Sequence, residues 1–233
     1  EALNAPSLAM VGARNASADG LDNSRRFARQ LAGSGFVIVS GLALGIDAAA
    51  HRGAVSAGRT VAVMGSGPDC IYPPRHGLLA SQIVEAGGAL VSEFAPGSRP
   101  LPAQFPMRNR IISGLASATV VVEAGIKSGT MITARMAADQ GRDVLAVPGA
   151  LGNPLSRGPH QLIREGALLV ETAQQILEAT MTTHMPAQQA SLPGFTDNDN
   201  RAASATSAPV SDAPDLLNHI DFNPTPVDVI ALR

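Results

Sequence analysis

The chain has 233 residues, a formal net charge of −2 at pH 7, no tryptophan and one tyrosine. Its single cysteine, Cys70, excludes an internal disulfide, and no apolar run approaches the roughly 20 residues of a membrane-spanning helix. The near-neutral charge excludes a broadly basic surface, so any site for nucleic acid must be a local patch. Together with an N-terminus that lacks a basic, apolar leader, these features predict a cytoplasmic protein.

Apolar runs of strand length alternate with helical patterns along the first 180 residues. The runs consist almost entirely of Val, Ile, Leu and Ala, which is typical of parallel strands that are covered on both faces. The intervening helical stretches end in glycines such as Gly35 and Gly141. The pattern predicts an α/β fold with an extended, Rossmann-like, doubly wound and mostly parallel sheet. Its strands are expected at 7–13, 36–41, 60–66, 89–94, 119–125, 143–149 and 168–170.

The composition changes near residue 180. Residues 181–214 are rich in Ala, Ser, Thr, Pro, Asn and Asp, and they carry too few large apolar side chains to offset the entropy of ordering. Apolar spacing returns at 215–233. We therefore expect a Rossmann-like domain over 1–180, a flexible linker over 181–214, and the start of a second, small helical domain over 215–233.

The expected strand ends are rich in glycine. The segments "VGARNAS" (11–17), "SGLALGID" (40–47), "GSGPDCIYP" (65–73) and "EAGIKSGT" (123–130) follow four of the strands. In an open parallel sheet, ligands bind beyond the carboxyl ends of the strands, where glycines and helix N-termini let backbone N–H groups approach an anion. Tight turns alone explain any one of these segments, whereas four at one edge favour an anion-binding crevice.

No catalytic or cofactor motif is complete. The segment at 65–70 ends in Cys70 where the dinucleotide fingerprint needs glycine, and "GIKSGT" lacks the P-loop spacing. We find no zinc motif and no nucleophile elbow, so the sequence predicts no metal, no cofactor and no catalytic residue. Glu93 and Glu123 end strands, where they either serve as acid–base groups or, as we favour, hold loop N–H groups and arginines. Asp47 and His51 are interpreted as a helix cap and an internal hydrogen-bonding residue.

The segment "FPMRNR" (105–110) supplies an aromatic ring and two arginines before an apolar run. With Arg14 after the first strand and Lys127 after the fifth, it provides the groups that bind single-stranded nucleic acid: a ring for bases and cations for phosphates. Core packing of Phe105 remains an open alternative. Arg108 is expected to make the direct phosphate contact, and the alternative for one arginine of the pair is to brace the fold by pairing with Glu93 or Glu123.

These segments, with "SEFAPG", "QLIREGA" and the block from 105 to 149, resemble the DNA-processing protein A (DprA or Smf) family over roughly residues 7–178. The resemblance implies a non-catalytic protein that binds single-stranded DNA, forms a homodimer, protects incoming DNA and helps load the RecA recombinase in natural transformation and recombination. It also implies that residues 215–233 begin a truncated winged-helix-like domain. The DNA-binding residues carried over or expected are Arg14, Ser40, Gly41, Phe105, Arg108, Asn109, Arg110, Lys127, Ser128, Gly129 and Thr130.

Two other functions remain open. The cytokinin-activating, lysine-decarboxylase-like phosphoribohydrolases hydrolyse nucleoside monophosphates, but Thr133 stands where their motif has its glutamate. A scaffold for a small ligand or protein partner is the third possibility. The sequence also departs from the DprA pattern at His160, where an asparagine is usual, and at Ala13 of "GAR", where serine is usual.

Overall fold

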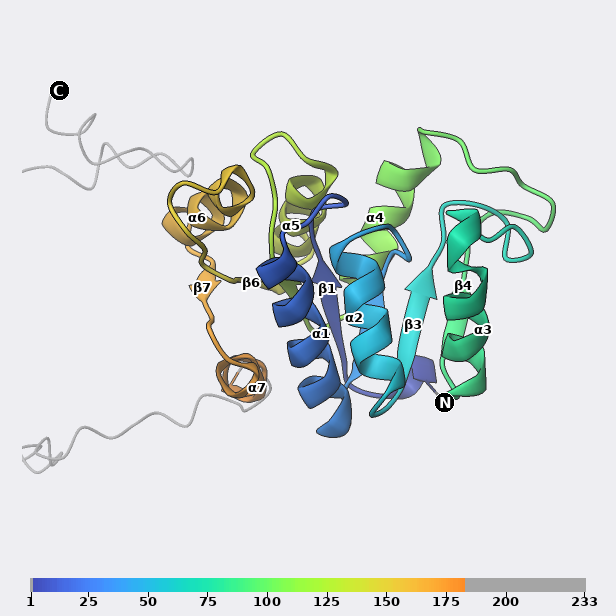
Figure 1. The fold of residues 1–233 in the computed structure, drawn as a ribbon, viewed down its shortest axis with the longest axis horizontal. Helices are drawn as coiled ribbons and strands as arrows, with labels where there is room; N and C mark the ends of the chain where they lie inside the picture. The colour runs from blue at the N-terminus through green and yellow to red at the C-terminus, as the bar shows by residue number, and fades with distance from the viewer. Residues whose placement is uncertain (1, 183–233) are drawn as a thin grey trace, which may run out of the picture. The chain divides into compact units, whose positions relative to one another are not determined.

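The computed structural model describes residues 2–182. Within them, seven strands form one sheet in the order β4-β3-β2-β1-β5-β6-β7, and every neighbouring pair is parallel (Figure 1). The predicted α/β class and parallel sheet are confirmed. The glycines that ended the predicted runs lie in the loops, so the strands are shorter than the sequence suggested. Their bounds are β1 (Ser7–Val11), β2 (Val37–Ser40), β3 (Thr60–Val63), β4 (Ala89–Val91), β5 (Ala118–Val121), β6 (Asp143–Ala146) and β7 (Leu168–Leu169).

Helices cover both faces of the sheet. In Figure 1, α1, α2 and α3 lie in front of the strands and α4 and α5 lie behind them. The helices are α1 (Ala18–Gly33), α2 (Ile46–Val55), α3 (Gly77–Glu85), α4 (Gln104–Leu115), α5 (Gly129–Asp139), α6 (Arg157–Arg164) and α7 (Ala173–Thr182). Short 3-10 turns occur at η1 (Ala2–Asn4), η2 (Pro74–His76) and η3 (Pro154–Ser156).

The central strand shows why the sequence lacks polar alternation. Leu8 and Met10 of β1 pack into the core cluster formed with α1, α2 and α7. Ala9 and Val11 pack into the opposite cluster, formed with α4, α5 and α6. Because successive side chains of a strand point to opposite faces, a strand covered on both sides is apolar at nearly every position.

Two predicted helix ends are confirmed by backbone conformation. Gly35 follows α1 with φ 94° and Gly141 follows α5 with φ 68°, in the left-handed region that glycine adopts without strain. At its other end, α1 begins after Ser17, whose side chain accepts a hydrogen bond from the N–H of Gly20.

The chain order creates a switch point between β1 and β5. The chain moves outward from β1 to β4, then crosses back through α4 to place β5 on the other side of β1. The connections on the two sides of β1 therefore diverge, which opens a crevice at the carboxyl ends of β1 and β5.

The end of the domain differs slightly from expectation. The predicted linker begins at 181, whereas α7 continues through Met181 to Thr182. The rest of that segment and the predicted small domain at 215–233 lie outside the described residues. Among residues 2–182, no helix combines the length and apolarity needed to cross a membrane.

Candidate functional site

A cavity of about 830 Å³ occupies the switch point. Its walls come from the loop after β1, the loop after β3, the first turns of α4, and the loop that leads from β5 into α5. Eight of the predicted DNA-binding residues line it: Arg14, Phe105, Arg108, Asn109, Lys127, Ser128, Gly129 and Thr130.

One wall is suited to an anion. Lys127 and Ser128 lie immediately before α5, and the N-cap Ser128 has an extended backbone. The first N–H groups of a helix have no helical acceptor and carry the positive end of the helix dipole. The Oγ atom of Ser128 is buried and has no hydrogen-bond partner among residues 2–182. Exposed Arg14 lines the same cavity from the β1–α1 loop.

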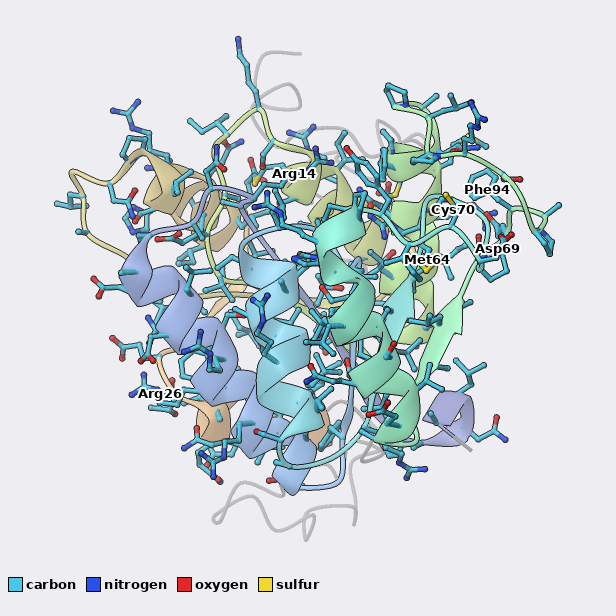
Figure 2. All side chains as sticks on the ribbon, turned by 45° about the vertical axis from the view of Figure 1, so that its right-hand side comes forward. Arg14, Arg26, Met64, Asp69, Cys70 and Phe94 are labelled. Atoms are coloured by element: carbon cyan, nitrogen blue, oxygen red, sulfur yellow. The ribbon has the colours of Figure 1, made fainter. Side chains whose placement is uncertain are left out.

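Backbone packing holds the Arg14 loop in place. The N–H of Ile46, at the start of α2, donates to the carbonyl oxygen of Ala13 at 3.1 Å. Gly45 makes this approach possible: its φ is 75°, and a Cβ atom there would lie 2.1 Å from the Ala13 oxygen. In Figure 2, Arg14 lies at the edge of the sheet where the strands end. Arg26, which belongs to α1, lies far from it, toward the opposite edge.

An adjoining part of the cavity wall is aromatic. The rings of Phe105 and Tyr72 lie 5.5 Å apart between centroids, tilted at 45°. The Cζ atom of Arg14 lies 5.7 Å from the Phe105 centroid, a cation–π distance. Tyr72 is absent from the residues expected on sequence grounds, because nothing in its own segment shows that the loop after β3 folds over the start of α4.

Arg108 is the floor of the cavity and not an exposed phosphate contact. It is 4 % exposed, and its Nη1 atom donates to the carbonyl oxygens of Gly41, at 2.7 Å, and Val63. Burial lowers the pKa of Arg108 to about 10, against the opposing effect of the Asp47 carboxylate. The position of Arg108 therefore does not favour the expected direct contact with a DNA phosphate. Its guanidinium donates to protein carbonyl groups instead, and it links the ends of β2 and β3.

Asp47 belongs to the same buried group. It accepts hydrogen bonds from the N–H groups of Gly41, at 3.1 Å, and Ala43, at 3.4 Å. Burial raises the pKa of Asp47, while nearby Arg108 lowers it. Asp47 thus holds the loop between β2 and α2. The expectation that it caps a helix is wrong, because the N-cap of α2 is Gly45 and no side chain caps this helix.

Three predicted residues are not among those that line the cavity. Ser40 donates to the carbonyl oxygen of Met10, and Gly41 contacts the Asp47–Arg108 group described above. The exposed Arg110 pairs with Glu93 instead. The bracing role expected for one arginine of the pair is confirmed for Arg110.

Glu123 is occupied by hydrogen bonds. Its carboxylate accepts from the N–H of Ser17 at 2.9 Å, from the Ser17 hydroxyl at 2.6 Å, and from Asn153 Nδ2 at 3.1 Å. This confirms the favoured interpretation, in which the glutamate holds loop groups. Thr133, at the position of the hydrolase glutamate, donates to the Gly129 carbonyl at 3.3 Å.

Two of the histidines that the structure describes, His51 and His160, have structural contacts. His51 is fully buried with its Nδ1 atom 2.8 Å from the Thr60 hydroxyl, and burial lowers its pKa to about 3. His160 accepts a hydrogen bond from the N–H of Gly149 at 3.3 Å. Among residues 2–182, no group of three or more His, Cys, Asp or Glu side chains is arranged to hold a metal ion.

Comparison with known proteins gives a consistent result. The family model for DNA recombination-mediator protein A matches residues 1–181. Protein Smf of Escherichia coli K12 is 44% identical over the whole chain, which covers 61% of that protein. The X-ray structure of DprA from Streptococcus pneumoniae is 43% identical with a TM-score of 0.71, over 76% of this chain and 62% of that one.

A second solved structure is DprA from Helicobacter pylori, described as showing a unique single-stranded DNA binding mode. It is 28% identical with a TM-score of 0.71, over 79% of this chain and 84% of that one. The two DprA names describe DNA processing, and none of the three relatives carries the name of an enzyme. The chain spans about three fifths of the length of the E. coli relative.

Proposed function

The chain belongs to the DNA recombination-mediator protein A family, and from this premise we propose that it binds single-stranded DNA in the cavity between β1 and β5. The observation that carries the proposal is that one cavity is lined both by cationic groups and by aromatic rings. Arg14, Lys127 and the start of α5 lie among its lining groups, as do two aromatic rings. Phosphates suit the first set and unpaired bases suit the second.

The proposal favours single strands over duplex. In a duplex the bases are stacked inside the helix, so only phosphates and groove edges reach a protein. Aromatic rings next to cationic groups can bind a strand through both its bases and its phosphates only when the bases are free of base-pair stacking, as in a single strand. Since every base has a flat face, the site is expected to tolerate any sequence.

The residues take different roles in this proposal. Arg14 and Lys127 contact phosphates, helped by the N–H groups and hydroxyls of Ser128, Gly129 and Thr130. Asn109 lies between the floor and α5, where its Oδ1 atom accepts from Arg108 Nε at 3.3 Å, and it is available to a base or sugar. Arg108 forms the floor of the cavity and holds the loop ends beneath it.

The wider role follows the family. We propose that the protein acts in the cytoplasm as a homodimer, protects incoming single strands, and helps load RecA during transformation and recombination. A molar mass of one chain in solution at all concentrations would contradict the dimer. Failure to accelerate RecA filament formation on protein-coated single strands would contradict the loading role.

The site itself is tested by fluorescence anisotropy with labelled oligo-dT. We expect saturable binding that unlabelled single strands displace far better than duplex of the same length. The double variant Arg14→Ala/Lys127→Ala should lose most of this binding while its unfolding curve stays unchanged. Release of free base from nucleoside monophosphates, without any DNA binding, would favour the phosphoribohydrolase function instead.

A further inference from the structure

Tyr72 lines the cavity but takes no part in the proposed phosphate contacts. It lies in the loop after β3, lines the cavity, and is 46% exposed. Its ring contacts Phe105, and no hydrogen bond of its hydroxyl group fixes it to the rest of residues 2–182. A half-exposed ring in the wall of a cavity is a surface on which a flat ligand can pack.

Phe105 is more enclosed than Tyr72. A Cβ atom built on Gly65 would lie 2.9 Å from Phe105 Cδ1, so the backbone of Gly65 closes one side of the ring. Arg14 and Tyr72 approach the same ring at 5.7 and 5.5 Å. With centroids this close and planes tilted at 45°, the two rings leave no room for a base between them.

We propose that Tyr72 is a base-stacking residue: a nucleobase of the bound single strand packs on its exposed face. The inference rests on the proposed function, since it takes the strand's phosphates to lie at Arg14 and Lys127. Phe105 then acts as a positioning residue that supports the Tyr72 ring on one side and the Arg14 guanidinium on another. Stacking needs only a π-face, so Tyr72 gives affinity without choosing among bases.

A direct test uses the fact that the chain has one tyrosine. The 233-residue chain labelled with 3-fluorotyrosine gives a single fluorine resonance, which reports Tyr72 without assignment. On titration with oligo-dT we expect this resonance to shift in step with binding measured by anisotropy. The matched ligand is an abasic strand of equal length, which keeps the phosphates and lacks the bases, and it should leave the resonance near its free position.

The outcomes separate the two proposals. A resonance that stays still while oligo-dT saturates the protein overturns the role of Tyr72 and leaves DNA binding intact. An equal shift with the abasic strand also overturns it, because that shift would not come from a base. Absence of binding by anisotropy would overturn the proposed function, and the stacking role with it.

Substitutions give an independent measurement. Tyr72→Ala should weaken oligo-dT binding by roughly 5- to 150-fold, the range for loss of one stacked base. Tyr72→Leu keeps apolar bulk without a π-face and should behave like alanine, whereas Tyr72→Phe should restore binding. The dependence on salt should be the same in all three, since none changes the charge. Wild-type affinity of a folded Tyr72→Leu variant would contradict the stacking role.

Discussion

The carboxylate of Glu123 holds Ser17 by two hydrogen bonds, from its N–H at 2.9 Å and its hydroxyl at 2.6 Å, across 106 positions of sequence. Ser17 is also the N-cap of α1, so the contact ties the end of β5 to the start of α1. Between β1 and Ser17 lies the loop that carries Arg14. A buried glutamate therefore determines where an exposed arginine stands in the cavity.

We predict that Glu123→Gln lowers both stability and DNA affinity. The glutamine side chain would place an NH2 group against Ser17 or Asn153, which donate hydrogen bonds to Glu123 in the structure. Each hydrogen bond to a charged acceptor contributes about 1.5–3 kcal/mol to stability. Urea unfolding should show a loss of that order, with weaker oligo-dT binding at low denaturant. Exposed Glu165→Gln is the control. Unchanged stability and binding in Glu123→Gln would remove the positioning role.

We predict that Arg108→Ala acts on stability and not on the salt dependence of binding. The change removes the buried donor to the carbonyl oxygens of Gly41 and Val63, and it also removes the positive charge near the Asp47 carboxylate. A buried polar group left without its partner costs about 1–3 kcal/mol. Lysine should not rescue it, because Arg108 uses two different nitrogens. Its Nη1 atom donates to the carbonyl oxygens of Gly41 and Val63, and its Nε atom donates to Asn109. In urea unfolding, Arg108→Met/Asp47→Asn should be more stable than Arg108→Ala. A fully stable Arg108→Ala variant would contradict this account.

We predict that His51 contributes to acid sensitivity. Its pKa is about 3 in the fold against 6.5 ordinarily, so between these values the unfolded chain binds a proton that the folded chain does not. Stability should therefore fall as the pH is lowered below about 6.5. Urea unfolding between pH 7 and about 5 should give a shallower pH dependence for His51→Gln than for wild type. An equal pH dependence for His51→Gln and wild type would contradict this account.

We predict that Gly45→Ala is strongly destabilising. Its φ of 75° is unfavourable for alanine, and the new Cβ would meet the Ala13 oxygen at 2.1 Å. Strain of this kind costs about 1–3 kcal/mol before the clash is added. Gly152→Ala is the control, since nothing lies within 4 Å of a Cβ there and its φ is ordinary. Equal melting temperatures for the two variants would show that the loop contact is not tight.

The sequence predicts the sheet well and the site only in part. Val37 to Val39 and the other buried runs carry their own signal, because parallel strands covered on both faces are apolar at nearly every position. Arg108 and Arg110 differ only in their tertiary contacts. Residues two apart on a helix do not share a face, so the two arginines could not both point into the cavity. Only the packing of α4 determines which of them is buried and which is exposed. Tyr72 reaches Phe105 across a loop, a contact that no local pattern records.

The most direct test of the central claim is the salt dependence of oligo-dT binding. For single strands, each phosphate contact contributes about −0.7 to the slope of log K against log salt. Removal of Arg14 and Lys127 together should flatten the slope by about 1.4 and weaken binding. Arg110→Ala, which removes a charge paired with Glu93 outside the cavity, should leave the slope close to wild type. A folded Arg14→Ala/Lys127→Ala variant with wild-type affinity and slope would contradict the claim that DNA phosphates bind here.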